Sequence, residues 1–400
     1  MNPTRPVPRF VRVWAILTAV VGFGLLFVLG GFVTSFRVGM ADPVWPTAPW
    51  YLAGQDWHKL EFGFLVEHTH RAAGWIFGAL CIVLTVGAWW SEPKRPLKFG
   101  GFGAIIALVG GYGSFHGAMM AAGAKLNDGT PLRDIDWSVA RMAGIFVLAM
   151  AGLVLLCAMA AASSSRPGRW PRALSLVLLV AVMIQGLLGG FRVLLNALFG
   201  PLLAAYHGVF AQFVFCLVVA IAVLSASPNP RRILPEPFRG RMTRLGWTLT
   251  GVVFLQLVFG AMVRHTGTPL AQRLHILTAF AVAGTVVWIA AVICSTPAAR
   301  AYRGLAFHLL GLLVLQIMLG VEAYLVKFAA VGPQATTLPE LRTITKMSAG
   351  LRTVHLLVGL GLLASALVLA LRANRAVSAA EASSPDTITR ATRPEPAAAD

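Results

Sequence analysis

Residues 203–225 read LAAYHGVFAQFVFCLVVAIAVLS, an apolar run that contains no Asp, Glu, Lys or Arg. A run of about 20 such residues is long enough to cross the hydrocarbon core of a bilayer as a helix. The 400-residue chain as a whole has the same character, with 57% hydrophobic residues, 12% charged residues and a mean hydropathy of +0.75. Ordinary soluble domains carry about 25% charged residues. The sequence therefore predicts an all-α polytopic membrane protein.

Ten apolar runs of this kind predict about ten membrane-spanning helices. They lie at residues 13–33, 63–89, 99–122, 139–162, 173–195, 203–225, 245–263, 274–295, 304–326 and 350–371. Of the 33 Lys and Arg residues, 20 fall in the segments on the side of the N-terminus and eight in the opposite loops. Because basic loops mark the cytoplasmic side, both termini are predicted to be cytoplasmic.

The net charge of +18 is therefore interpreted as a sign of topology rather than of nucleic-acid binding. No Arg- and Ser-rich transit peptide is evident, which favours a bacterial plasma membrane. The cysteines Cys81, Cys157, Cys216 and Cys294 each fall inside an apolar run, and none belongs to a CxxC pair. We expect small buried side chains there rather than a disulfide framework or a metal site.

A glutamine and a glycine recur four residues apart in three of the predicted helices. The pairs are Gln185 with Gly189, Gln256 with Gly260, and Gln316 with Gly320, and the first helix has Gly30 and Gly31 without the glutamine. Residues four apart share one face of a helix. Close helix packing is the simplest role for such a pair, and the spacing marks repeated units.

Each marked helix leads through an outer loop to a helix that begins near a histidine, and the third and fourth predicted helices lack both features. We therefore predict two pseudo-symmetric four-helix bundles with one inserted helical hairpin. The N-terminal bundle comprises residues 1–90 and 173–225, the hairpin 91–172, and the C-terminal bundle 245–371, and a disordered cytoplasmic tail follows at 372–400.

The four histidines His70, His207, His275 and His355 lie at a similar depth, near the outer ends of their helices. Imidazoles on neighbouring helices at matched depth suit the axial ligation of haem iron. Zinc favours a tight cluster with cysteine or carboxylate, and di-iron sites need several glutamates. Five arginines near the helix ends are expected either to pair with haem propionates or to reach the membrane interface. They are Arg71, Arg192, Arg264, Arg273 and Arg352.

Glu67 is the acid placed best for chemistry, because it lies three residues before His70 on the same helix face. A carboxylate one turn from an iron ligand is suited to proton transfer or to the stabilisation of positive charge. The alternative is an ion pair with Arg71 at i+4. The second acid inside an apolar run, Glu322, is expected to be structural.

The other histidines are expected to matter less. His68 is predicted to point to a different face from His70, and His265 is a candidate for the edge of a haem site. His58, His116 and His308 are expected to be incidental.

These motifs resemble the haem A synthase family. The matching residues are Glu67, His70 and Arg71, the Gly30–Thr34 end of the first helix, and the stretch from Gly260 to Thr266. The resemblance covers most of residues 10–90 and 173–371. The chain differs from the family in three features: the inserted hairpin 91–172, a short loop at 264–272, and a first outer loop that has no cysteine pair.

The resemblance implies a membrane oxidoreductase that oxidises a methyl group of haem O to a formyl group, in haem A biosynthesis for cytochrome oxidase assembly. By that resemblance, His70 and His207 flank the substrate haem O, and Glu67 is the catalytic carboxylate. His275 and His355 hold a permanent haem b, and Arg71 and Arg264 contact haem.

The implied partners are haem O and an electron acceptor. Haem O synthase, cytochrome oxidase assembly proteins and further copies of the chain are candidate partners, and nucleic acid is not. Two other functions remain as alternatives. A non-catalytic bis-histidine dihaem cytochrome would explain the histidines but does not require Glu67. A haem transporter would need a polar path that the nearly uncharged inner halves of the helices do not offer.

Overall fold

The computed structural model describes residues 7–42, 45–227, 233–328 and 344–378, which contain ten helical spans long and apolar enough to cross a membrane. The first span joins α1 (Arg9–Val21), a π-helical segment (Gly22–Phe27) and α2 (Val28–Ser35). The others contain α3 (Phe62–Trp90), α4 (Arg95–Asn127), α5 (Ser138–Ala162), α6 (Arg169–Leu194), α7 (Asn196–Leu224), α8 (Glu236–His265), α9 (Pro269–Ser295), α10 (Arg303–Phe328) and α11 (Lys346–Asn374). Each span coincides with one predicted run, so the predicted all-α polytopic fold is confirmed.

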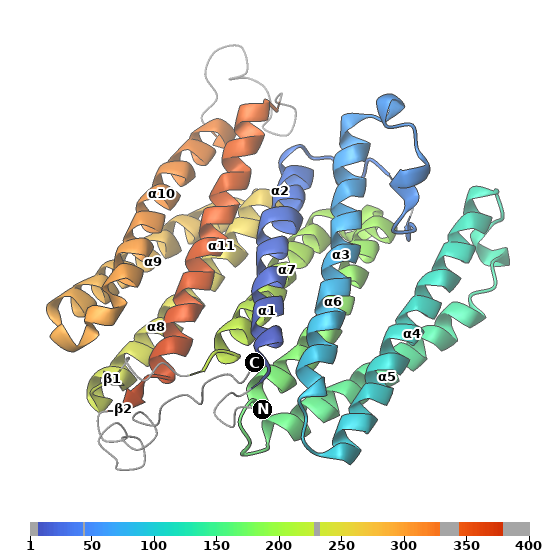
Figure 1. Ribbon diagram of the computed structural model, residues 1–400. Helices are drawn as coiled ribbons and strands as arrows, with labels where there is room; N and C mark the ends of the chain where they lie inside the picture. Colours follow the sequence, from blue (N-terminus) through green and yellow to red (C-terminus); the bar gives the residue numbers. More distant parts are fainter. Residues whose placement is uncertain (1–6, 43–44, 228–232, 329–343, 379–400) are drawn as a thin grey trace.

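The helices form two four-helix bundles side by side, with a hairpin at one edge (Figure 1). The first bundle contains α1–α2, α3, α6 and α7, and the second contains α8 to α11. Helices α7 and α2 pack against α11, so these three elements join the bundles. The α4–α5 hairpin packs on the outside of the first bundle, mainly through α5 against α6.

Three clusters of buried apolar side chains lie inside these units. The first includes Val11, Phe77, Cys81 and Val218, the second includes Leu249, Val286, Leu309 and Leu363, and the third includes Trp89, Leu108, Val154 and Leu176. The third cluster combines residues of α4 and α5 with residues of α3 and α6. The hairpin is thus held by its own apolar contacts with the first bundle.

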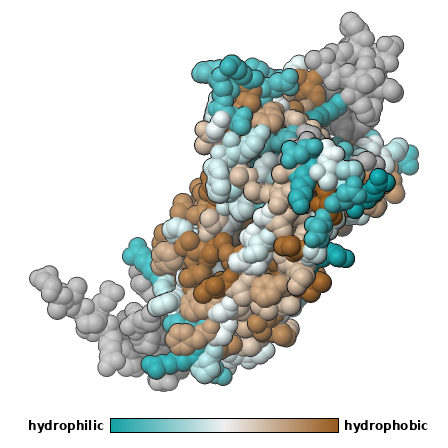
Figure 2. All heavy atoms as spheres, turned by 90° about the vertical axis from the view of Figure 1, so that its right-hand side faces the viewer, coloured by the Kyte–Doolittle hydropathy of each residue, from teal (hydrophilic) through white to brown (hydrophobic). Residues whose placement is uncertain are grey.

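The outer surface of the hairpin is strongly apolar. Figure 2 shows hydrophobic side chains gathered over the middle of this face, with hydrophilic residues toward the ends. Ile106, Met142 and Leu148 are each about 70% exposed, at 71%, 72% and 73%. Side chains of this kind would be unfavourable in water over so wide an area, whereas lipid tails solvate them.

Short irregular elements connect the spans. Turns of 3₁₀-helix lie at Tyr51–Gly54, Trp57–Lys59, Leu132–Asp134 and Pro297–Tyr302. The two-residue strands β1 (Ile233–Leu234) and β2 (Val377–Ser378) pair in parallel beyond the end of α11. Within the predicted tail 372–400, residues 372–378 therefore continue α11 and form β2, and the remainder lies outside the described residues.

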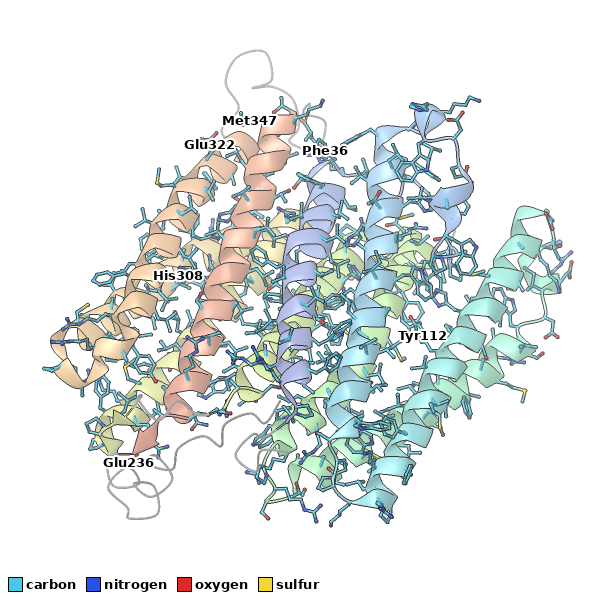
Figure 3. All side chains as sticks on the ribbon, in the orientation of Figure 1. Phe36, Tyr112, Glu236, His308, Glu322 and Met347 are labelled. Carbon is cyan, nitrogen blue, oxygen red and sulfur yellow. The ribbon has the colours of Figure 1, made fainter. Side chains whose placement is uncertain are left out.

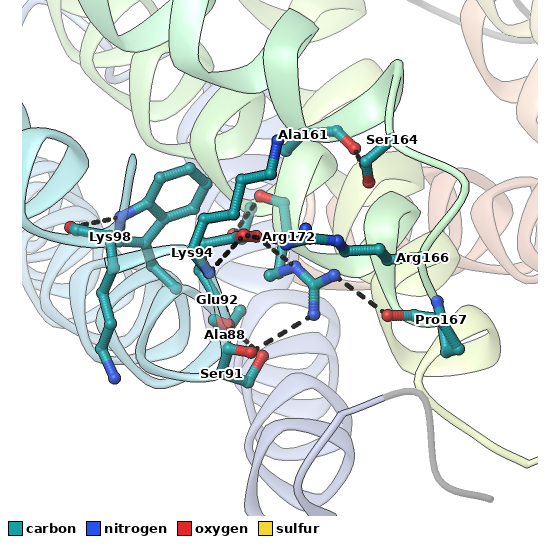
Figure 4. A network of polar contacts seen from close by, with 12 residues as sticks. Ala88, Ser91, Glu92, Lys94, Lys98, Ala161, Ser164, Arg166, Pro167 and Arg172 are labelled. Carbon is teal, nitrogen blue, oxygen red and sulfur yellow. Dashed lines mark hydrogen bonds and ion pairs between the residues drawn. The ribbon is translucent and has the colours of Figure 1, made fainter. Parts of the chain in front are cut away.

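A buried ion pair fixes the start of α6 to the end of α3 (Figure 4). The Arg172 Nε atom lies 3.1 Å from Glu92 Oε2, and both side chains are 3% exposed. Arg172 also donates to the carbonyl of Pro167 at 3.0 Å. Arg166 is a more exposed second partner of Glu92, at 3.6 Å. The network joins the two ends of the chain segment that forms the hairpin.

Replacing Arg172 with methionine is expected to destabilise the protein by about 3–5 kcal/mol, because the Glu92 carboxylate would stay buried without its main partner. The matched change Arg166→Met should cost about 1 kcal/mol or less, because that pair is longer and more exposed. Thermal unfolding of both variants in detergent measures the difference. Equal midpoints for the two variants would refute the assigned role of Arg172.

Candidate functional site

The four predicted histidines form two pairs, one in each bundle. His70 on α3 faces His207 on α7, with ring centroids 6.4 Å apart and an interplanar angle of 84°. His275 on α9 faces His355 on α11, with the same separation of 6.4 Å and an angle of 76°. The internal duplication expected from the sequence therefore extends to the geometry of the side chains.

Each histidine lies against a glycine of the preceding core helix. A Cβ atom added at Gly30 would lie 2.9 Å from the His70 ring, and one at Gly320 would lie 3.0 Å from the His355 ring. The corresponding distances are 3.3 Å for Gly189 with His207 and 3.1 Å for Gly260 with His275. The distance at Gly30 is shorter than real Cβ atoms show, and the other three are tighter than most real Cβ contacts, so the glycines let the imidazole rings lie close to the helix surface.

The glutamine one turn before three of these glycines reaches the same histidine. Gln185 Nε2 lies 3.1 Å from His207 Nδ1 and donates to the His207 carbonyl at 3.0 Å. Gln256 Nε2 lies 3.4 Å from His275 Nε2. Gln316 Nε2 lies 3.4 Å from His355 Nε2. The repeated spacing is thus more than a packing marker, because both of its residues contact the histidine.

The histidine pairs fit an iron porphyrin on three grounds. A metal–imidazole bond is about 2 Å, and the ring centre lies roughly 1 Å behind the nitrogen, so two axial ligands of one ion have centroids about 6 Å apart. His275 Nδ1 lies 3.1 Å from the Gln256 carbonyl, and Nε2, which here contacts the Gln256 amide nitrogen at 3.4 Å, is the atom that would bind a metal in place of that contact. His70 Nδ1 and His355 Nδ1 are buried and have no hydrogen-bond partner in the part of the chain that the structure describes.

A metal site made of protein ligands alone is a poorer fit. Among the described residues, no group of three or more His, Cys, Asp or Glu side chains is close enough to hold an ion. The four cysteines are all free. Cys81 is buried as predicted, Cys157 and Cys216 are half-buried, and the prediction of a buried side chain is wrong for Cys294, which is exposed. Pairs of imidazoles suit an ion whose remaining ligands come with it, which is the case for haem iron.

Glu67 lies beside the first pair in a buried polar cluster. Its Oε1 atom accepts a hydrogen bond from Arg71 Nη2 at 2.7 Å, and its Oε2 atom accepts one from the Asp42 backbone at 3.0 Å. The Asp42 carboxylate in turn lies 2.7 Å from His68 Nε2. Both oxygens of Glu67 are therefore held, and the carboxylate has one orientation.

Arg71 forms the i+4 ion pair with Glu67 that the sequence analysis gave as an alternative. Its guanidinium binds Glu67, donates to the Asp42 carbonyl at 2.8 Å and lies 3.6 Å from the Asp42 carboxylate. In this structure the guanidinium is therefore held by Glu67 and Asp42. Arg192, at the end of α6, instead lies over Gly39 and within electrostatic range of Glu67, His70 and His207.

Arg264 joins the two bundles. From α8 it donates to Thr34 Oγ1 on α2 at 2.6 Å and to the Arg352 carbonyl on α11 at 2.9 Å. Its charge lies within electrostatic range of Arg352 and His355. The predicted haem-contact residue is therefore close to the second histidine pair and also fixes the bundle interface, whereas Arg273 is exposed.

The remaining histidines and Glu322 are more dispersed. His265 lies within electrostatic range of His207. His58 and His308 are exposed, as is Glu322, and Figure 3 shows Glu322 near the end of α10 that leads toward α11. His68 stacks on Tyr51 with centroids 4.9 Å apart. Among these residues, only His265 lies near a predicted ligand.

The structure places two residues in contacts that the sequence did not predict. Asp42 comes from an outer loop, and nothing in its sequence context indicated that it would fold back onto Glu67. His116 was expected to be incidental, but it is buried among the rings of Trp45, Trp75 and Tyr112, at centroid distances of 5.2, 5.0 and 5.4 Å. It therefore attaches the hairpin to α3 and to the first outer loop.

Comparison with known proteins finds a match to one family model. Residues 135–273 match the COX15-CtaA family, described as cytochrome oxidase assembly protein. The match includes His207, Gln256 and Arg264, begins before α5 and ends before His275. No curated protein and no solved structure matches the chain.

Proposed function

We propose that this chain, which is similar over residues 135–273 to the COX15-CtaA family of cytochrome oxidase assembly proteins, is a haem A synthase-like oxidoreductase of the membrane. It would oxidise the methyl group of haem O to a formyl group in haem A biosynthesis. The observation that carries the proposal is the pair of matched histidine sites, together with the buried Glu67 carboxylate one helical turn from His70 in the first.

His70 and His207 are the residues that would bind the substrate haem O in the first bundle. His275 and His355 are those that would hold haem b in the second. Haem b supplies reversible one-electron chemistry when it is bound. The glycines beside the four histidines set how close the imidazoles lie to the helices, and this fixes the ring positions before binding.

Glu67 is the group that would handle a proton or stabilise positive charge at the substrate. Hydrogen bonds from Arg71 and from the Asp42 backbone hold both of its oxygens and fix its direction. Arg192 provides a positive charge on the same side of the first pair. Because these groups are buried, they act in a medium of low dielectric constant, where each charge has a larger effect than in water.

The interface between the bundles gives a short path from one histidine pair to the other. Ser35 on α2 and Thr353 on α11 share a hydrogen bond of 3.1 Å, and Thr353 also packs on Gly31. Arg264 adds its contacts to Thr34 and to Arg352. These contacts place the two histidine pairs on elements that pack directly on one another, and electrons could pass between groups bound at the two pairs.

Expression in a bacterial membrane that contains haem O, followed by chromatography and mass analysis of the extracted haems, tests the proposed reaction. Formyl haem or its hydroxymethyl precursor is expected in cells with the protein and not in cells with the empty vector. Bound haem b without any new product would contradict the enzyme. It would support the dihaem cytochrome, which the equal separation of the two pairs also suits.

A further inference from the structure

A groove lies on the second bundle between α8 and α9, near the end of α8 that begins at Glu236, which Figure 3 labels. It has a volume of about 380 Å³ and is lined by Arg241, Arg244, Leu245 and Thr248 of α8 and by Trp288 of α9. Gly260, on which the His275 ring packs, lies about 18 Å farther along α8 than Thr248. The groove is therefore separate from the histidine pairs.

The protein around the groove is strongly basic. Seven arginines and one acid, Glu236, lie in the described segments that form this end of the bundle, at residues 233–248, 295–303 and 371–378. The acid is taken up by Arg239, with which it forms an ion pair. Arg241 and Arg244 form no hydrogen bond or ion pair with any residue that the structure describes. The two guanidinium groups of the groove are therefore able to bind an anion.

The lining of the groove combines charged and apolar side chains. Arg241 and Arg244 are exposed and lie three residues apart, so they share one face of α8. Leu245 beside them is 7% exposed, and Trp288 on the facing helix is 54% exposed. Arginine binds phosphate through its planar guanidinium, and tryptophan is enriched where a membrane meets water. The groove thus has a cationic rim next to an apolar and aromatic wall.

The surroundings of the groove select the class of ligand. The apolar run of α8 begins at residue 245, so the two arginines lie where lipid headgroups meet the protein, and Trp288 lies inside the run of α9. A free phosphate or a soluble acidic peptide would use the cationic rim but would leave the apolar wall without a partner. A phospholipid occupies both parts. The leaflet on the predicted cytoplasmic side is also the one with the negative surface potential.

We propose that this groove binds an anionic phospholipid of the leaflet on the predicted cytoplasmic side. Arg241 and Arg244 bind the phosphate, and Leu245 and Trp288 contact the first part of an acyl chain. The bound lipid joins α8 to α9 and so stabilises the second bundle. The site does not depend on the proposed reaction, because it shares no residue with the histidine pairs or with the cluster around Glu67.

Native mass spectrometry of the detergent-solubilised protein, titrated with phosphatidylglycerol, tests the site. Phosphatidylglycerol is expected to bind more tightly than phosphatidylcholine with the same acyl chains, and to raise the midpoint of thermal unfolding more. Arg241→Gln and Arg244→Gln should each weaken its binding by roughly fivefold, the contribution of one basic residue at an anionic membrane surface. Arg300→Gln is the matched control, because Arg300 is exposed at the same end of the bundle but does not line the groove. It should bind phosphatidylglycerol as the wild type does.

The control separates a built site from a general attraction to the basic surface. An equal loss of binding in Arg300→Gln would show a diffuse attraction and would overturn the site. Unchanged binding in both Arg241→Gln and Arg244→Gln, or equal binding of the two lipids by the wild type, would overturn it as well. If inorganic phosphate raises the unfolding midpoint as much as phosphatidylglycerol does, the ligand is a free anion and the lipid assignment is wrong.

Discussion

Replacing His355 with alanine is expected to reduce the haem content of the purified protein from two haems per chain to one. His355 and His275 face one another at 6.4 Å, and a single imidazole cannot hold the iron from both sides. A haem that is held through one imidazole is expected to dissociate more readily during purification than one held through two. His275→Ala should have the same effect, and the haem-to-protein ratio measures both.

His308→Ala is the matched control, because His308 lies in the same bundle but is exposed and belongs to neither pair. It should retain both haems. Normal haem content in both His275→Ala and His355→Ala would show that these residues are not the ligands.

Replacing Glu67 with glutamine is expected to abolish conversion of haem O while the haem content stays normal. The substitution keeps the size and one acceptor oxygen for Arg71, but it removes the negative charge and the capacity to take a proton. General acid–base groups contribute about 10²–10⁴-fold to rate, so a loss of about 100-fold or more is expected. Product formation per bound haem is the quantity to measure.

Glu322→Gln is the control for this second prediction, because Glu322 is the other acid inside a predicted apolar run and is exposed on α10. It should convert haem O normally. Unchanged conversion in Glu67→Gln would remove the carboxylate from the mechanism and leave it as a structural partner of Arg71.

The fold was largely predictable because the membrane imposes a simple rule on the sequence. Each span must be about 20 apolar residues long, and the ten helices follow the ten runs from 13–33 to 350–371. The sequence also predicts His70, His207, His275 and His355 near the outer ends of their helices, and the structure brings these four side chains together as two facing pairs.

The contacts around the histidines could not be predicted in the same way. Whether Gln316 reaches His355 depends on helix crossing angles and on side-chain rotamers, which residue spacing does not determine. The position of Asp42 beside Glu67 depends on the path of an outer loop. The burial of His116 depends on how closely the hairpin packs on α3, and the amino-acid pattern of α4 does not specify this.

The most direct test of the account is the number and ligation of the haems in the purified wild-type protein. Quantitative haem analysis with optical and electron paramagnetic resonance spectroscopy gives both quantities in one preparation. We predict two haems per chain, with the low-spin spectrum of bis-imidazole ligation in the oxidised state. No bound haem, or a spectrum that requires a thiolate or thioether ligand, would contradict the assignment of the histidine pairs.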